Sequence, residues 1–460
     1  MIKMTNEPTY SELKLPNYRN QSTAVTLRAV VKDKEMKLEV PTQEIVIVPA
    51  LCGLNMMLVS DTGKGKTQLM RDIVQHYFGG NVSESGHANW LLGRKDVSVE
   101  DLFREFDKSQ MKYVTKEERI RALVNGVDEL NRALGPVQND FFDLAEGERA
   151  IDGRLRELGK DGYTFLMAAV NLNRTNGDFE GTSDMDRAFL SRSRINFDFD
   201  YLDTTDEDKA EINSQGKARL KIAPARDISE KILAACKHIS AEASRPEPYI
   251  DAYMMILSSG LDYCKKDELK KKRRDWPNSC GDCNSNTDNK ALCAKIKQFE
   301  PRTTQTIKRF AFGLHYLLNL REGGVAIDPF DLVFESAKFT AYHGNLNMRE
   351  LLDTHKGDDQ HMMNTVLANL RNQVQAVKSE LNDAISRAMN GEVVTKYVKY
   401  ELNGQEHIAP YNTEFIKKLD SKNVAYQEYN PFNALERSGV RMDWLEPYLK
   451  AVARRHKKNE

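Results

Sequence analysis

The chain has 460 residues, which suggests about three domains and leaves room for several sizeable cores. Lysine and arginine total 67 against 68 aspartates and glutamates, and 40% of residues are hydrophobic, so a histone-like basic protein and an acidic disordered chain are excluded. No apolar run approaches about 18 residues, and the N-terminus lacks an apolar signal core. We therefore expect a cytoplasmic protein without a membrane span, and its six cysteines do not make a disulfide scaffold.

The first half of the chain is predicted to be an N-terminal extension followed by an α/β domain. Residues 1–35 are polar with weak strand character, and between residues 36 and 205 apolar runs alternate with helical patterns. That alternation is typical of a mostly parallel sheet covered by helices. The predicted strands of this sheet are residues 55–60, 120–129, 163–171 and 195–201.

The second half is predicted to be mainly helical. Helical patterns dominate residues 206–345, where a polar, cysteine-bearing stretch interrupts them at about 260–297. Residues 346–391 are predicted to contain a long helix with a heptad seam, which fits a coiled coil, a helical hairpin or an amphipathic helix packed on its own domain. Residues 392–460 are predicted to form a small α+β module with a hairpin turn at Asn403-Gly404. The seam consists of Met363, Leu367, Leu370, Val374, Val377, Leu381 and Ala384.

A glycine-rich loop joins the first predicted core strand to a helix. Its residues are Ser60, Asp61, Thr62, Gly63, Lys64, Gly65, Lys66 and Thr67, which match the P-loop pattern G-x-x-x-x-G-K-[ST] except for serine at the first position. Glycines let the backbone wrap phosphates, and N–H groups at the helix N-terminus point at the anion. The pattern predicts that Lys66 neutralises ATP phosphates and that Thr67 ligates Mg²⁺. The alternative is a Gly/Lys-rich loop that binds no ligand.

Polar residues end the next two predicted strands. Asp128 and Glu129 suit ATP hydrolysis, with the aspartate holding the Mg²⁺ shell and the glutamate activating water, although surface Asp-Glu pairs are common. Asn171 would reach the water or the γ-phosphate, unless it is only a strand-end turn residue. Arg187 and Arg192 lie about one helical turn apart. Either they form a solvated helix face, or one of them completes the ATP site of a neighbouring subunit.

Together these motifs resemble those of the AAA+ ATPases, and more narrowly those of the MoxR branch. The family's order is kept over about residues 50–205 and 298–343, where six stretches carry the resemblance. They resemble, in turn, the D-E-[IL]-N-R-A motif (128–133), the helix after it (137–146), the sensor strand (165–171), the arginine-finger segment (180–192), the S-P-R lid sensor (299–302) and the V-T-P-E-D-V turn (327–332).

The resemblance implies a fold and a role for each site residue. It makes residues 36–205 an AAA+ nucleotide-binding core and residues 206–345 a helical lid that carries the cysteine-rich insertion. The hydrolytic pair would be Asp128 and Glu129, the two sensors Asn171 and Arg302, and the finger Arg192, with Arg187 and Arg194 as rivals because Arg192-Ser193-Arg194 replaces the usual Arg-Phe. Family members form hexameric rings that remodel or activate client proteins, often with a von Willebrand-type partner.

Four of the six cysteines cluster in the insertion. Cys264, Cys280, Cys283 and Cys293 have the spacing C-x15-C-x2-C-x9-C, and four thiolates can complete a tetrahedral zinc site. An iron–sulfur cluster and a flexible loop with unligated cysteines are the alternatives. Residues 265–274 contain seven basic side chains, which form either a nucleic-acid contact or a solvated helix face.

The sequence therefore predicts a Mg²⁺-dependent AAA+ ATPase of the MoxR type that acts as a ring on a protein client. One alternative is a helicase-like motor that contacts nucleic acid through the basic, cysteine-rich insertion. Another is a scaffold that is switched by nucleotide without hydrolysing it. Stimulation of ATP turnover by single-stranded DNA would support the helicase-like motor. Absence of ATP turnover would support the scaffold.

Overall fold

In the computed structural model the chain forms two compact units. The first comprises Met1–Arg245, Gln305–Gly344 and Lys356–Gln360, and the second comprises Pro246–Thr304, Asn345–His355 and His361–Glu460. These units do not coincide with the five segments predicted from the sequence, whose boundaries stay predictions. The structure describes residues 7–15, 22–61, 63–79, 88–94, 98–133, 135–171, 189, 192–202, 206–214, 226–261, 292–340, 345–430, 432 and 443–459.

The first unit is built around a five-stranded sheet whose neighbouring strands are all parallel. In space the strands follow the order β11 (Ile195–Asp198), β3 (Met56–Ser60), β10 (Phe165–Asn171), β7 (Val124–Asp128) and β4 (Ala88–Leu92). Every residue of β3, β7, β10 and β11 is buried, as expected for a parallel sheet covered on both faces. The α/β core and its four predicted strands are thereby confirmed.

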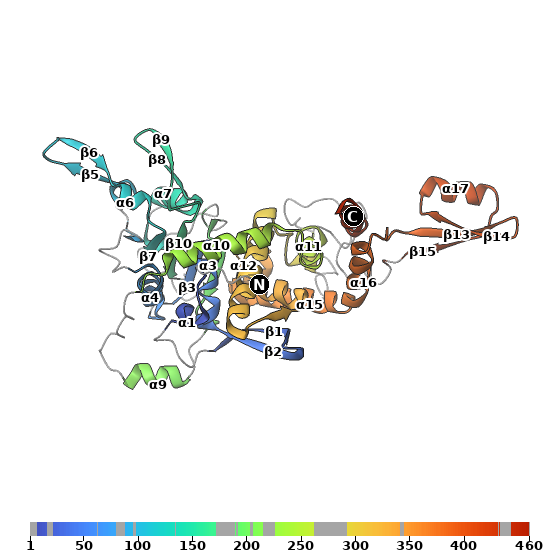
Figure 1. The fold of residues 1–460 in the computed structure, drawn as a ribbon, viewed down its shortest axis with the longest axis horizontal. Helices are drawn as coiled ribbons and strands as arrows, with labels where there is room; N and C mark the ends of the chain where they lie inside the picture. The colour runs from blue at the N-terminus through green and yellow to red at the C-terminus, as the bar shows by residue number, and fades with distance from the viewer. Residues whose placement is uncertain are drawn as a thin grey trace. The chain divides into compact units, whose positions relative to one another are not determined.

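Helices cover this sheet and connect its strands (Figure 1). The P-loop helix α4 (Lys66–Phe78) begins directly after Gly65 and ends before Gly79, and both glycines adopt the left-handed conformation that commonly flanks helix ends. Helix α7 (Gly135–Glu146) lies in the connection between β7 and β10. Helix α10 (Ser229–Ser244) packs against α3 (Val48–Cys52). Shorter helices of this unit are α1 (Tyr10–Leu13), α2 (Thr42–Ile45), α5 (Glu100–Phe103), α6 (Glu117–Ile120), α9 (Asp206–Ser214) and α13 (Pro329–Ala337).

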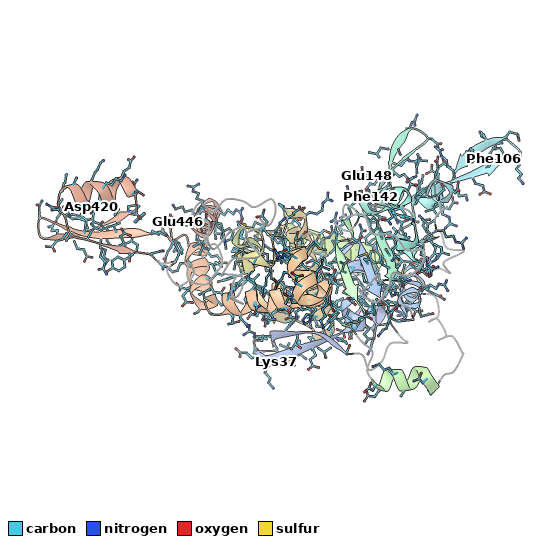
Figure 2. The ribbon with its side chains drawn as sticks, turned by 180° about the vertical axis from the view of Figure 1, so that it is seen from behind. Lys37, Phe106, Phe142, Glu148, Asp420 and Glu446 are labelled. Atoms are coloured by element: carbon cyan, nitrogen blue, oxygen red, sulfur yellow. The ribbon has the colours of Figure 1, made fainter. Side chains whose placement is uncertain are left out.

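Two β-hairpins project from the core on the same side (Figure 1). One pairs β5 (Arg104–Asp107) with β6 (Lys112–Thr115), and the other pairs β8 (Glu148–Ile151) with β9 (Arg154–Glu157). The ring of Phe106 on β5, labelled in Figure 2, meets the ring of Tyr113 on β6 edge to face, and both residues are exposed. Sequence reasoning did not predict either hairpin, because each strand is only four residues long and lacks a buried face to mark it.

A separate antiparallel sheet of three strands is also part of the first unit. Its central strand β1 (Thr23–Val31) pairs with β2 (Lys34–Pro41) and with β12 (Val325–Ile327), which is distant in sequence. Arg28 on β1 fixes this sheet to α13, because its guanidinium donates to both carboxylate oxygens of buried Asp331 at 2.6 and 3.0 Å.

The second unit is mainly helical. Helix α12 (Pro301–Glu322) begins in it, and its remaining helices are α11 (Pro248–Met255), α14 (Met348–His355), α15 (Asp359–Gln375), α16 (Lys378–Met389) and α19 (Leu445–Asn459), with short turns η2 (Ile256–Gly260) and η4 (Leu292–Ala294). Tyr253 on α11 donates to Asn382 on α16 at 2.8 Å, and Tyr448 on α19 donates to the carbonyl of Pro248 at 2.6 Å. Side-chain hydrogen bonds therefore join α11 to both of its neighbours.

The prediction of one long helix or coiled coil within 346–391 is wrong. The helical pattern is divided between α15 and α16, because Val377 leaves the helical conformation with φ −124° and ψ 12°. All seven predicted seam residues are buried. Periodicity identified which side chains are buried, but it did not show that two helices rather than one carry them.

The C-terminal α+β module has the predicted hairpin. Strands β13 (Tyr397–Leu402) and β14 (Gln405–Pro410) are joined at Asn403 and Gly404, both with positive φ, and β15 (Tyr426–Tyr429) pairs with the other side of β13. Helix α17 (Thr413–Ser421) covers one face of this sheet, where Val398, Ile416 and Leu419 form a small core.

Candidate nucleotide-binding site

The loop after β3 has the backbone conformation that an anion-binding loop needs. Ser60 is the fully buried last residue of β3, and Gly63 and Gly65 both have φ of 82°. A Cβ atom added at either glycine would meet nothing within 4 Å, so the positive φ rather than a lack of space explains glycine there. The amino end of α4 follows at Lys66, which presents N–H groups to this loop. Thr62 lies outside the described residues.

The Lys66 side chain lies buried beneath the loop. Its amine donates to the carbonyl oxygens of Ser60 and Asp61 and to the Ser60 hydroxyl, each at 2.9 Å. Burial lowers the pKa of the Lys66 ammonium, while the carboxylates of Asp200 and Asp128 favour its charged form. The amine is therefore held at the loop by three oxygen acceptors.

The tertiary structure joins the P-loop to the acidic pair. Thr67 donates its hydroxyl to both carboxylate oxygens of Asp128, at 3.0 and 2.8 Å. A hydroxyl and a carboxylate are the oxygen ligands that Mg²⁺ accepts, so this donor set fits the ion that the sequence predicts. Glu129 follows in a left-handed conformation, with φ of 52°, and its N–H donates to Asp128 at 3.0 Å. Its carboxylate lies 3.3 Å from Arg132.

Asn171 ends β10 between the P-loop strand and the acidic strand. It pairs in register with Ser60, so its side chain is at the same edge of the sheet as the loop. Asn131, which sequence reasoning did not single out, fixes this position: it donates to the carbonyl of Asn171 at 2.6 Å and accepts from the N–H of Asn171 at 3.3 Å. The only sequence signal for Asn131 was its place within the D-E-L-N-R-A motif.

Two further aspartates at this edge were missed by sequence reasoning. Asp198 is the last residue of β11 and pairs with Val59, and Asp200 lies two residues later, 3.8 Å from the amine of Lys64. Both carboxylates act electrostatically on Lys66. The alternating acidic residues at the end of the predicted strand 195–201 were the available signal. Their place near the loop became clear only because β11 is the neighbour of β3 in the sheet.

The arginine-finger candidates are not part of this constellation. Arg192 precedes β11 at the amino end of the sheet, where its carbonyl accepts from Asn55 at 3.3 Å. Because β3 spans five residues, Arg192 and the loop after Ser60 are separated by roughly 15 Å. Arg194 lies beside Arg192 and is partly buried, whereas Arg187 falls outside the described residues. Arg302 is in the first turn of α12, in the other unit.

The predicted zinc site falls mostly outside the part of the chain that the structure describes. Cys264, Cys280 and Cys283 are not described, and Cys293 is buried in η4. Among the described residues, no group of three or more histidines, cysteines or acids could hold a metal ion. The four-cysteine ligand set therefore stays a prediction.

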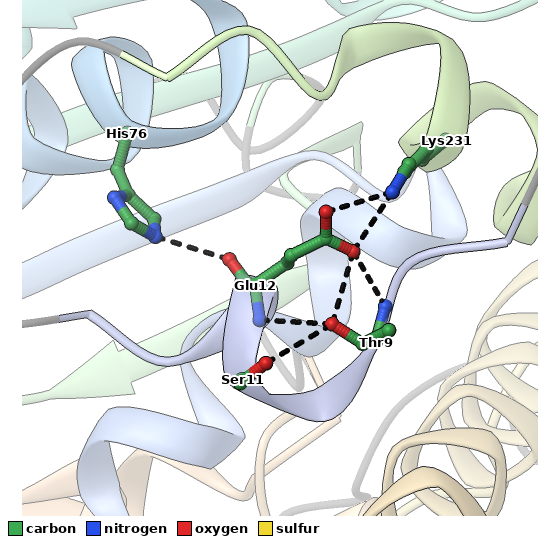
Figure 3. Close-up of polar contacts among 5 residues, drawn as sticks. All are labelled: Thr9, Ser11, Glu12, His76 and Lys231. Atoms are coloured by element: carbon green, nitrogen blue, oxygen red, sulfur yellow. Dashed lines mark hydrogen bonds and ion pairs between the residues drawn. The ribbon is translucent and has the colours of Figure 1, made fainter.

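The far end of the P-loop helix is anchored to the N-terminal segment (Figure 3). The ring of His76 on α4 forms a hydrogen bond of 3.0 Å with the carbonyl of Glu12, and the Glu12 carboxylate lies 2.7 Å from the Lys231 amine on α10. Hydrogen bonds from Lys231 and Thr9 lower the pKa of the Glu12 carboxyl to about 2. Helix α1 therefore connects the end of α4 to α10.

Comparison with known proteins supports the fold. No family model and no curated protein matches the sequence. Among solved structures, the chain is similar to a protein from Cytophaga hutchinsonii named "putative ATPase", with a TM-score of 0.50 and 16% sequence identity, over 71% of this chain and 88% of that one. At this identity the likeness shows a shared fold.

In the described ranges, no helix combines the length and apolar character that crossing a bilayer requires.

Proposed function

We propose that the chain is a Mg²⁺-dependent ATPase of the AAA+ class. The observation that carries this proposal is the contact of the P-loop Thr67 with Asp128, beside the buried amine of Lys66. Thr67 and Lys66 lie at the N-terminus of α4 and Asp128 ends β7, so the three groups meet at the carboxyl edge of a parallel sheet, where α/β proteins bind ligands. The fold shared with the Cytophaga hutchinsonii protein supports the same class.

The chain's own residues divide the work of hydrolysis. Backbone N–H groups of Gly63 and Gly65 and the amine of Lys66 would bind the phosphates, with Lys66 exchanging its loop acceptors for phosphate oxygens. Thr67 and Asp128 would hold Mg²⁺, which neutralises charge on the β- and γ-phosphates. The Glu129 carboxylate would orient a water molecule and accept its proton as the water oxygen bonds to the γ-phosphorus and the bond to the β-phosphate oxygen breaks, which yields ADP and phosphate.

We further propose that the chain acts in a ring, as MoxR-type hexamers do, with Arg192 completing the site of the adjacent subunit. A trans-acting arginine must lie away from the P-loop of its own subunit, and Arg192 lies at the opposite end of β3. Asn171 and Arg302 would act as the two sensors. Residues 36–205 would form the core and 206–345 the lid, and the ring would remodel a protein client, with a von Willebrand-type domain as a candidate partner.

A mixing experiment tests the catalytic and the trans roles together. Glu129→Gln should bind ATP without turning it over, and Arg192→Ala should bind ATP with turnover reduced about 10³-fold or more. Mixed, the two variants should regain activity, because the intact site of one subunit then faces the intact arginine of the other. Full turnover by Glu129→Gln alone would remove the role of Glu129, and failure of the mixture to regain activity would remove the trans role of Arg192.

Two further parts of the proposal have their own measurements. The Glu129→Gln protein held in ATP should retain a protein client in a pull-down, because a ring arrested before hydrolysis keeps its client bound.

Zinc bound by Cys264, Cys280, Cys283 and Cys293 should appear as about one equivalent in elemental analysis. Iron with acid-labile sulfide would indicate a cluster instead, and absence of both would remove the metal site.

A further inference from the structure

The side chain of Arg192 is held by helix α7 of its own chain. Its Nε lies 2.6 Å from Oε1 of Glu146, the last residue of α7. Its guanidinium also lies 5.1 Å from the ring centroid of Phe142, one turn earlier on the same helix. Phe142 in turn stacks on Phe189 with an interplanar angle of 19°. A carboxylate and an aromatic face therefore bind the same guanidinium.

The backbone beside this contact is fixed independently of it. Asn55 donates to the carbonyl of Ala145 at 2.7 Å and to the carbonyl of Arg192 at 3.3 Å. This amide joins the end of α7 to the segment before β11, whichever way the Arg192 side chain points. The side chain can therefore change partner without unfolding the segment that carries it.

The position of Glu146 is unusual for a carboxylate. The carboxyl end of a helix carries a partial negative charge, which disfavours an acidic side chain there unless a cation compensates. Asp143, in the same last turn, has such a cation in Arg149 at 3.1 Å. The Asp143–Arg149 pair is thus a second ion pair in the last turn of α7 that does not involve Arg192. It serves as the control for substitutions of Glu146.

We propose that Glu146 is a positioning residue that holds Arg192 in a parked state until a neighbouring subunit presents ATP. This inference rests on the proposed function, since it requires Arg192 to act in trans. The γ-phosphate of a neighbour competes with the carboxylate of Glu146 for the guanidinium, and the more highly charged phosphate forms the stronger pair. Transfer of Arg192 from Glu146 to phosphate links the occupancy of one subunit's site to α7 of the next.

The test uses the full chain and follows ATP turnover together with thermal unfolding. Glu146→Gln removes the negative charge and keeps the shape, so turnover per assembled subunit should rise about 1.5- to 5-fold, the range expected for losing one partly exposed ion pair. Phe142→Leu should raise turnover less, and it provides a second variant if Glu146→Gln unfolds. Asp143→Asn, which removes the charge from the matched pair with Arg149, should leave turnover unchanged.

A mixed assembly separates parking from a structural effect. When Glu129→Gln chains supply the arginine and Arg192→Ala chains supply the site, Glu146→Gln should raise turnover only if placed in the chain that carries Arg192. An equal rise in turnover whichever chain carries Glu146→Gln would overturn the parking role alone. So would the absence of any rise when Glu146→Gln is the only substitution in an active assembly. Absence of turnover in the wild type would instead overturn the proposed function, and the parking role with it.

Discussion

Gly93 should be essential for hydrolysis because it packs against the backbone of Glu129. It follows β4, and its N–H donates to the carbonyl of Asp128 at 2.7 Å. A Cβ atom at this position would lie 2.8 Å from the carbonyl carbon of Glu129, closer still to its oxygen, and 3.0 Å from Cα of Leu130. All three are backbone atoms, so Gly93→Ala must displace the Glu129 backbone by roughly half to one ångström. A misplacement of about 1 Å can cost about 100-fold in rate.

The assay compares turnover with nucleotide affinity. Gly93→Ala should lower kcat about 100-fold while the ATP dissociation constant changes little, because Lys66 and Thr67 are on a different strand–helix junction. The control is Gly153→Ala in the β8–β9 turn, where an added Cβ meets nothing within 4 Å and only the φ of 71° is strained. Normal turnover in Gly93→Ala, or ATP binding lost as strongly as turnover, would refute the steric argument.

Three further substitutions test separate parts of the structure. Ser60→Ala removes one acceptor of the Lys66 amine and should tighten ATP binding about 2- to 10-fold by titration; unchanged affinity would contradict this. Glu12→Gln should cost about 1 kcal/mol of unfolding free energy at pH 7. Because the Glu12 pKa falls from 4.5 to about 2 on folding, this difference should vanish between pH 4.5 and 2, and a constant difference would exclude the linkage. Leu370 is fully buried in α15, so Leu370→Ala should lower the free energy of unfolding by about 2–5 kcal/mol in denaturant unfolding. Almost no change would indicate that the heptad seam is exposed.

The local parts of the fold were predictable because the signals lie within a few residues of each other. Runs of apolar residues marked β3, β7, β10 and β11, since strands of a buried parallel sheet have no polar face. The P-loop was recognisable because its glycines must adopt positive φ and its lysine and threonine follow at fixed spacing. The turn at Asn403-Gly404 was equally local.

The sequence by itself determined which residues are buried, where the phosphate-binding loop lies and which acids follow a core strand. Only the tertiary structure decided which of them meet: strand order places Asn171 beside Ser60, brings Asp198 and Asp200 to the P-loop and separates Arg192 from it. It also divided the predicted long helix at Val377 and gave Arg192 a partner in Glu146. The physical reason is that periodicity reports only whether a side chain is covered, whereas partners are chosen by sheet order and packing between segments far apart in the chain.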